Sequence, residues 1–192
     1  MGANAAAIGP DFTLGVKLGE LPVSGTIAGH VGDEPVLLSR IDGELFAVSG
    51  TCTHYGAALA SGLLDEDTVR CPLHHACFSL RTGAALRAPA LDPLDPWQVE
   101  VDDELVFVRH KRERRMEAGR GIPSRNVGDI VIIGGGAAGL ACANELRRLG
   151  YSAAITMLTA DSDPPCDRPN LSKDYLAGTA PEEWLPLRVE SW

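Results

Sequence analysis

Two short cysteine–histidine pairs constrain this chain more than any other feature of its sequence. The first is Cys52-Thr-His54 and the second is Cys71-Pro-Leu-His74, with sixteen residues between them. Thiolates and imidazoles are the common soft and borderline metal ligands of proteins. The fold therefore has to hold two loops side by side so that both pairs reach one metal centre.

Two kinds of metal centre use two thiolates and two imidazoles. In an asymmetric 2Fe–2S cluster one iron takes both thiolates and the other takes both imidazoles, so each short pair straddles two metal atoms. Zinc takes neighbouring ligands on a single ion and prefers a wider gap than Cys-x-His. The spacing favours a cluster held by Cys52, His54, Cys71 and His74, and predicts a protein that carries electrons. The alternative is a zinc site in a non-redox or interaction protein.

The residues around both pairs resemble the cluster-binding loops of Rieske ferredoxins, over about residues 12–110. The resemblance is carried by Cys52-Thr-His-Tyr-Gly-Ala57 and Cys71-Pro-Leu-His-His-Ala-Cys-Phe78, then by the turn Leu80-Arg-Thr-Gly83 and by Ala88-Pro-Ala90. By this resemblance, the proline-containing loop shields the cluster. Leu73 stands where tryptophan is often found, and His75 where glycine is usual. The second departure predicts a positive φ at His75, which histidine tolerates better than most side chains.

The same resemblance implies a low reduction potential. High-potential members of the family have an extra cysteine in each ligand loop, joined as a disulfide, and Ala57 and Leu73 occupy those positions here. Those members also hydrogen-bond the cluster sulfurs and a ligand thiolate through a serine and a tyrosine, where this chain has Ala76 and Phe78. We expect a potential towards the bottom of the roughly −150 to +300 mV range of such centres.

Composition and charge indicate which classes of partner and which cellular compartment to expect for this protein. The net charge is −9, although residues 111–125 hold six of the seventeen basic residues and only two of the twenty-six acidic ones. An acidic body disfavours nucleic acid as a partner and favours docking to basic surfaces. The cysteines outside the two ligand pairs are isolated and the start of the chain shows no secretory signal, which favours a cytoplasmic protein. The sequence contains no apolar run of 18 residues, so we expect no membrane span.

Hydrophobic periodicity divides the chain into two folds. Residues 1–110 read as an all-β Rieske-type sandwich, with one hairpin over 36–48 that turns at Asp42-Gly43 and another over 98–109. Residues 111–128 are basic and contain glycine and proline, which is typical of a solvated linker. The alternative for this stretch is a nucleic-acid-binding or nuclear-localisation patch.

Residues 129–192 read as a partial α/β segment of the Rossmann type. A buried strand over 129–133 leads into the turn that contains Gly134, Gly136 and Gly139, a helix over 137–149 and a second strand near 153–158. The three glycines would permit the tight turn, the close approach of a pyrophosphate, and the packing of the helix on the strand, respectively. Asp161 is a candidate for the ribose hydroxyls, although a surface aspartate explains it nearly as well.

The segment that follows resembles the Arg-Pro-x-Leu-Ser-Lys motif of FAD-dependent ferredoxin and rubredoxin reductases. It is Arg168-Pro169-Asn-Leu-Ser-Lys173, and the resemblance implies that Arg168 and Pro169 contact the flavin nucleotide while Lys173 lies near the isoalloxazine. A loop in which Ser172 caps the start of a helix is the alternative. A Rieske domain ahead of such a flavin fold resembles the apoptosis-inducing-factor-like oxidoreductases, which pass electrons between NAD(P)H, FAD and the cluster.

The flavin fold is expected to be incomplete. About 64 residues after the linker are too few for an ordinary doubly wound sheet, and no second Gly-x-Gly-x-x-Gly is present for a nicotinamide. We therefore expect a truncated FAD-binding domain that does not retain FAD alone, and we assign no catalytic residue to the chain. The expected partners are a flavin domain or flavoprotein as electron donor and a redox partner protein such as an oxygenase.

Overall fold

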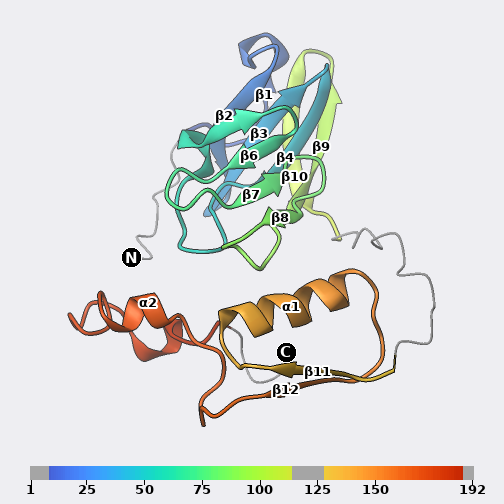
Figure 1. Cartoon of the computed structure of the whole chain (residues 1–192). Helices are drawn as coiled ribbons and strands as arrows, with labels where there is room; N and C mark the ends of the chain where they lie inside the picture. The colour runs from blue at the N-terminus through green and yellow to red at the C-terminus, as the bar shows by residue number, and fades with distance from the viewer. Residues whose placement is uncertain (1–8, 114–127, 188–192) are drawn as a thin grey trace. The chain divides into compact units, whose positions relative to one another are not determined.

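The computed structural model describes residues 9–113 and 128–187, which form two compact units (Figure 1). The basic linker expected over 111–128 lies mainly outside the described residues, and Lys111 is the last residue of a strand. Within the described residues, no helix is long and apolar enough to cross a membrane.

The larger sheet of the first unit has six antiparallel strands in the order β1-β10-β9-β4-β3-β2. These strands are β1 Val16–Lys17, β2 Gly25–Val31, β3 Glu34–Ile41, β4 Glu44–Ser49, β9 Pro96–Asp102 and β10 Leu105–Lys111. Both predicted hairpins are confirmed as β3–β4 and β9–β10. Asp42 and Gly43 have φ of 51° and 82°, as a two-residue turn of this type requires.

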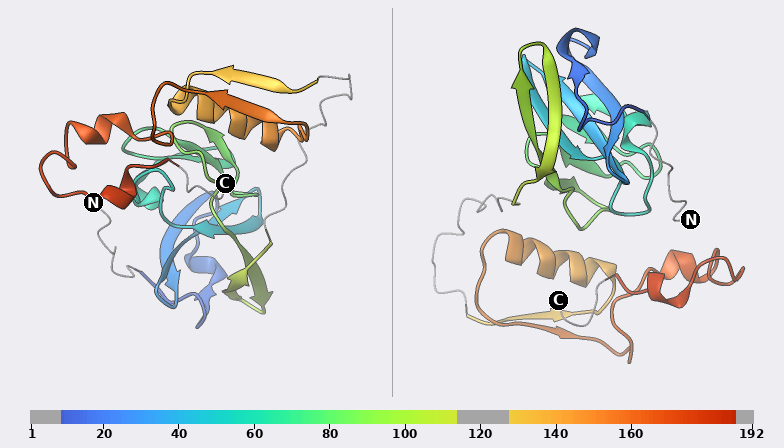
Figure 2. Two further views of the ribbon diagram at one scale, coloured as in Figure 1. Left: turned by 90° about the horizontal axis from the view of Figure 1, so that it is seen from below. Right: turned by 180° about the vertical axis from the view of Figure 1, so that it is seen from behind.

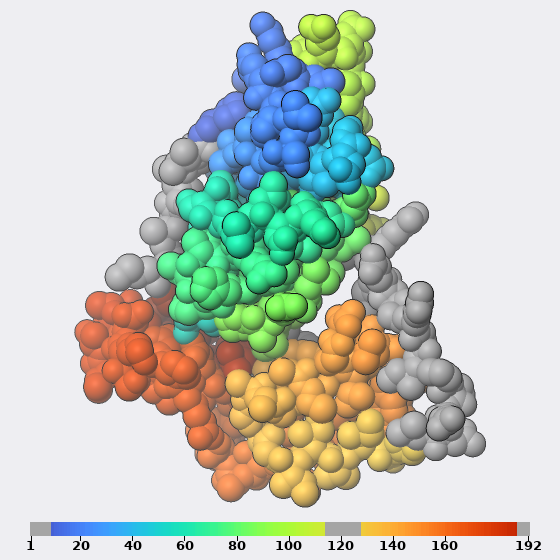
Figure 3. Space-filling model, turned by 45° about the horizontal axis from the view of Figure 1, so that its top comes forward, coloured from blue at the N-terminus to red at the C-terminus, as the bar shows by residue number. Residues whose placement is uncertain are grey.

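A second sheet of four short antiparallel strands has the order β5-β6-β7-β8. The strands are β5 Leu63–Asp65, β6 Thr68–Arg70, β7 Cys77–Ser79 and β8 Ala85–Arg87. Two 3₁₀ helices, η1 Leu18–Glu20 and η2 Leu59–Ser61, complete the unit. The green residues in the space-filling view, which include these strands and their turns, form one continuous surface (Figure 3).

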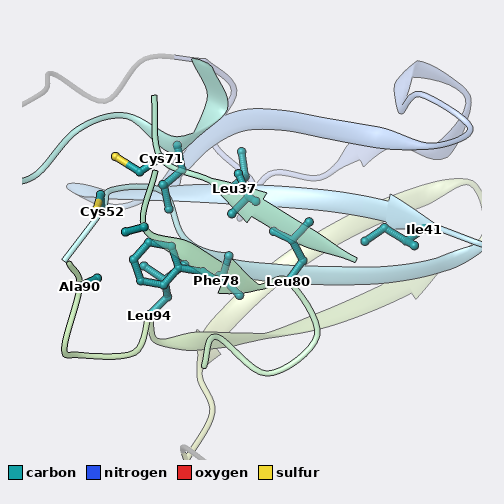
Figure 4. Close-up of a cluster of buried hydrophobic side chains, with 12 residues drawn as sticks. Leu37, Ile41, Cys52, Cys71, Phe78, Leu80, Ala90 and Leu94 are labelled. Atoms are coloured by element: carbon teal, nitrogen blue, oxygen red, sulfur yellow. The ribbon is translucent and has the colours of Figure 1, made fainter. Parts of the chain in front are cut away.

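Side chains of β3 contribute to two separate cores because alternate residues of a strand point to opposite faces. Leu37 and Ile41 belong to one buried cluster with residues of the four-stranded sheet, such as Val69 and Phe78 (Figure 4). Val36 and Leu38 belong to a second cluster with side chains from β4, β9 and β10. The six-stranded sheet therefore buries both of its faces, and the first core joins the two sheets.

The second unit is a small α/β segment (Figure 2). Strands β11 Ile130–Ile133 and β12 Ile155–Leu158 are parallel neighbours, connected through helix α1 Ala137–Arg148. The predicted βαβ arrangement is therefore confirmed. A one-turn helix, α2 Arg168–Leu171, and a 3₁₀ helix, η3 Glu182–Trp184, follow.

One buried hydroxyl of β3 provides a test of the first core. The Ser39 side chain is fully buried on the same face of β3 as Leu37, and its Oγ has no hydrogen-bond partner among the described residues. Leaving such a group without a partner costs at least about 1 kcal/mol. We expect Ser39→Ala to raise the free energy of unfolding by about that amount, measured by chemical denaturation of the full chain.

The exposed Ser24 provides the matched control. Ser24→Ala should change the free energy of unfolding by less than about 0.5 kcal/mol. A loss of stability in Ser39→Ala would contradict the expectation, because it would mean that the hydroxyl has a favourable partner in the native protein.

Candidate metal centre

The two predicted ligand loops leave the ends of strands that the first core holds together. The first loop runs from the end of β4 to η2, and the second connects β6 to β7. Cys52 and Cys71 are only 3% and 2% exposed, and both belong to the core that joins the two sheets (Figure 4). The side of each loop that carries the cysteine is therefore continuous with the hydrophobic interior.

Backbone hydrogen bonds close the first loop. The amide of Cys52 donates to the carbonyl of Ala57 at 2.8 Å, and the amide of Gly56 donates to the carbonyl of Cys52 at 2.8 Å. Gly56 has φ of 70°, a conformation that favours glycine. These bonds fix the direction in which the Cys52 side chain leaves the loop.

The second loop has the same hydrogen-bonding arrangement at the same spacing. The amide of Cys71 donates to the carbonyl of Ala76 at 2.8 Å, and the amide of His75 donates to the carbonyl of Cys71 at 3.1 Å. His75 has φ of 60°, so the positive φ predicted there is confirmed. The two cysteines are therefore presented by two equivalent turns, one of which uses histidine where the other uses glycine.

The two thiols form the inner pair of the site. Both belong to the same buried cluster, and burial is the largest of the effects that raise the pKa of the Cys52 thiol to about 11. A hydrogen bond from the backbone of His54 lowers this pKa in part, and the neighbouring Cys71 raises it further. Because iron and zinc bind thiolates, metal binding here has to displace protons from a desolvated pair.

The two imidazoles form the outer pair. The ring centroids of His54 and His74 are 5.0 Å apart and the ring planes are nearly perpendicular, at 81°. His74 is exposed, whereas His54 is half-buried and its Nδ1 atom is buried. Thiol therefore lies with thiol and ring with ring, as a centre with two differently ligated iron atoms requires. Within the ranges 9–113 and 128–187, no three His, Cys, Asp or Glu side chains are grouped as ligands of a single ion.

The residues around the thiols fit a shielded cluster. The proline-containing loop contributes Ala90, which is 4% exposed and lies in the same buried cluster as both cysteines (Figure 4). Thr53, inside the first ligand loop, donates its hydroxyl to the carbonyl of Asp92 at 2.7 Å. This bond ties the first loop to the segment after Ala90. No local sequence signal marks Thr53, because its partner lies 39 residues away in the chain.

Cys77 is the one other cysteine of the first unit, and it follows the second loop at the start of β7. It is 5% exposed and unpaired with any other cysteine. Cys77 therefore belongs to neither the thiol pair nor the imidazole pair of the candidate site.

The predicted glycine turn of the second unit has the expected geometry at two positions. Gly134 has φ of 117°, which confirms the need for glycine in the tight turn. A Cβ on Gly139 would lie 2.1 Å from the carbonyl oxygen of Gly134, so Gly139 is required for the close packing of α1 on β11. Gly136 is the N-cap of α1, and a Cβ there would meet nothing within 4 Å. The space beside Gly136 thus suits an anion at the helix N-terminus.

A second close approach in this turn, at Gly135, was not predicted from the sequence. A Cβ on Gly135 would lie 2.5 Å from the Cβ of Thr159, which follows the end of β12. The hydroxyl of Thr159 accepts a hydrogen bond from the amide of Asp161 at 3.1 Å. The run of three glycines was the available signal, since the standard motif explains only the outer two.

The structure brings Asp161 and Arg168 together. Asp161 Oδ2 accepts a hydrogen bond from Arg168 Nη2 at 2.5 Å, and both side chains are exposed. Lys173 Nζ donates to the carbonyl of Pro169 at 3.1 Å. The alternative in which Ser172 caps the start of a helix is wrong, because Ser172 follows the last residue of α2 and donates to the carbonyl of Pro169 at 3.2 Å. Its hydroxyl therefore acts at the end of that helix.

Both units match known families. Residues 16–114 match the Rieske [2Fe-2S] domain, and residues 128–190 match the pyridine nucleotide-disulphide oxidoreductases. Apoptosis-inducing factor 3 of Homo sapiens is 40% identical over 173 residues, which are 85% of this chain and 28% of that protein. The mouse protein of the same name is also matched over 28% of its length, so the chain spans under a third of these relatives.

The first unit is also similar to ferredoxins of dioxygenases. The 3-phenylpropionate/cinnamic acid dioxygenase ferredoxin subunit of Photorhabdus laumondii is 44% identical over 80 residues, covering 41% of this chain and 76% of that protein. The solved ferredoxin of carbazole 1,9a-dioxygenase from Nocardioides aromaticivorans is 29% identical, with a TM-score of 0.47, and is matched over 49% of this chain and 92% of its own.

The glycine turn gives a matched pair of variants. We expect Gly139→Ala to destabilise the second unit by about 1–3 kcal/mol, because the added methyl group overlaps the backbone of Gly134. Hydrogen–deuterium exchange of the amides in α1 should become faster. Gly136→Ala, where φ is −87° and the space is open, should leave this exchange unchanged. Equal effects of the two variants would contradict the packing role assigned to Gly139.

Proposed function

Because the chain belongs to the Rieske [2Fe-2S] domain family, we propose that it transfers electrons one at a time between a flavin and a protein partner. Its second unit is the start of a pyridine nucleotide-disulphide oxidoreductase domain. On this proposal the chain is the N-terminal part of an NAD(P)H- and FAD-dependent oxidoreductase. The Rieske match implies a 2Fe–2S cluster, and the second match implies FAD in the full protein.

The observation that carries the proposal is the separation of the four candidate ligands into an inner thiol pair and an outer imidazole pair. We assign Cys52 and Cys71 to one iron, and His54 and His74 to the other. A bound cluster of this kind takes up and releases single electrons. The cysteines anchor the site in the hydrophobic core, whereas His74 is exposed, which supports the approach of a partner protein on the imidazole side.

The second unit supports a flavin as the electron donor. The open space at Gly136, at the N-terminus of α1, suits the pyrophosphate of FAD, and Arg168, Pro169, Lys173 and Asp161 are the further candidates for contacts with the nucleotide and flavin. The identity to dioxygenase ferredoxin subunits supports an oxygenase-type protein as the acceptor. The acidic composition outside 111–125 suits a basic docking surface on that partner. Five free cysteines suit a reducing compartment such as the cytoplasm.

The ligand assignment is tested with two buried cysteines of the same unit. Wild-type protein should contain iron and acid-labile sulfide, and after reduction give a rhombic electron paramagnetic resonance (EPR) spectrum. Its average g value should lie below that of a ferredoxin with four thiolates, because imidazole ligation makes one iron more electron-poor. We expect Cys71→Ala to lose this spectrum and Cys77→Ala to keep it. Anaerobically prepared protein with one zinc and neither iron nor sulfide would support the zinc alternative instead.

The reduction potential tests the surroundings of the thiols. Ala76 and Phe78 are fully buried in the core that contains Cys52 and Cys71 (Figure 4), so neither position supplies a hydroxyl to the sulfur side of the site. Hydrogen bonds to the sulfurs stabilise the reduced form by offsetting its added negative charge. We therefore expect a midpoint potential towards the bottom of the roughly −150 to +300 mV range.

Variants at these positions should move the potential in a known direction. We expect the double change Ala76→Ser and Phe78→Tyr to raise the midpoint, measured by protein-film voltammetry near neutral pH. The controls Leu73→Trp and His75→Gly, which add no such hydroxyl, should change it less. A wild-type midpoint above about +100 mV would mean that other dipoles outweigh the missing hydroxyls.

A further inference from the structure

An aromatic side chain that is not itself a candidate ligand contacts both candidate histidine ligands. The ring centroid of Tyr55 is 4.1 Å from that of His54, with the planes tilted by 31°. The same ring lies 5.7 Å from the ring of His74, at 67°. With the direct contact between the two imidazoles, the three rings form a closed group in which each touches the other two.

The contact between Tyr55 and His74 joins the two ligand loops on the outer side of the site. On the inner side the loops meet through the buried thiols and the hydrophobic core. On the outer side His74 is exposed, so its ring is not held there by the core. Tyr55 belongs to the first loop but lies against a ring of the second, and therefore supplies a contact between loops where the core supplies none.

The aromatic ring of Tyr55 makes the contacts with both imidazoles. A 4.1 Å, moderately tilted contact on one imidazole is close to offset stacking, and the 67° contact on the other is close to edge-to-face. Both are favourable arrangements for aromatic pairs. Tyr55 is 40% exposed, so packing of the interior does not require a large side chain at this position.

We propose that Tyr55 is a positioning residue of the metal centre, whose ring holds the imidazoles of His54 and His74 in the orientation in which they bind metal. This inference rests on the proposed 2Fe–2S ligation. It concerns the rigidity of the imidazole side, since the thiol side is already fixed by burial and backbone hydrogen bonds.

The test compares Tyr55→Phe, Tyr55→Leu and Tyr55→Ala with Leu73→Ala in the full chain. Leu73 is the matched control because it is also exposed, at 58%, and precedes the other candidate histidine ligand in sequence. Two properties are measured: the linewidths and imidazole-nitrogen couplings in the EPR spectrum of the reduced protein, and the rate at which iron is lost to a chelator. Neither readout depends on catalytic activity.

We expect Tyr55→Phe and Leu73→Ala to match the wild type in both measurements. Tyr55→Leu and Tyr55→Ala should give broader EPR lines and altered nitrogen couplings, and should lose iron roughly three to ten times faster, because two aromatic contacts are removed. If Tyr55→Ala holds no cluster at all, the comparison of Tyr55→Leu with Tyr55→Phe decides, since both side chains are large and apolar and only one is aromatic.

The possible failures are distinguishable. A normal wild-type spectrum with no difference in Tyr55→Leu and Tyr55→Ala would overturn the role of Tyr55 and leave the proposed function standing. A change in Tyr55→Phe equal to that in Tyr55→Leu would assign the effect to the hydroxyl and overturn the role of the ring. If Leu73→Ala changed the EPR spectrum and the rate of iron loss as much as Tyr55→Ala does, any exposed apolar side chain would have this effect. The specific role of Tyr55 would then be overturned. Wild-type protein without iron would overturn the proposed function and this inference with it.

Discussion

The site depends on two pairs of backbone hydrogen bonds, one in each ligand loop. In both loops the cysteine amide donates to the carbonyl five residues later, and the cysteine carbonyl accepts from the amide four residues later. These bonds hold the backbone of each turn, from which the buried thiols extend into the core. Their cost is a backbone with positive φ at the fourth position, which Gly56 adopts easily and His75 adopts less easily. The turns that carry the candidate ligands are thus held by hydrogen bonds of the chain's own backbone.

Burial of the two thiols links the metal centre to the stability of the first unit. Cys52 and Cys71 are members of the same buried cluster as Leu37 and Phe78, which joins the two sheets. A thiolate in such surroundings is costly, and this is why the pKa of Cys52 rises to about 11. A metal that takes both thiolates replaces the lost hydration with direct bonds, so the centre and the core between the sheets should stabilise each other.

The parts that could be predicted from sequence are those with a local signal. The ligand spacing, the hairpin at Asp42-Gly43 and the positive φ at His75 each depend on a few neighbouring residues, and the structure bears out the hairpin and the φ value. The strands of the four-stranded sheet have only three residues each, which is too short to show an alternating pattern. Contacts such as Thr53 with Asp92, or Gly135 with Thr159, are formed by segments distant in sequence. They depend on how the strands are placed, and no single stretch of sequence encodes that.

The thiol side of the site is buried and the imidazole side is exposed, and this difference affects the side from which a redox partner can approach. Cys52 and Cys71 are enclosed by apolar side chains, and Ala90 covers them from the proline-containing loop. His74 and Tyr55 lie at the surface, in ring-to-ring contact with each other and with His54. If the four ligands hold a cluster as proposed, a partner can approach the imidazole side closely, whereas the thiol side is separated from solvent by the core. On this proposal the rings that would bind the outer iron are also groups that a redox partner would meet, so their orientation would affect both metal binding and electron exchange.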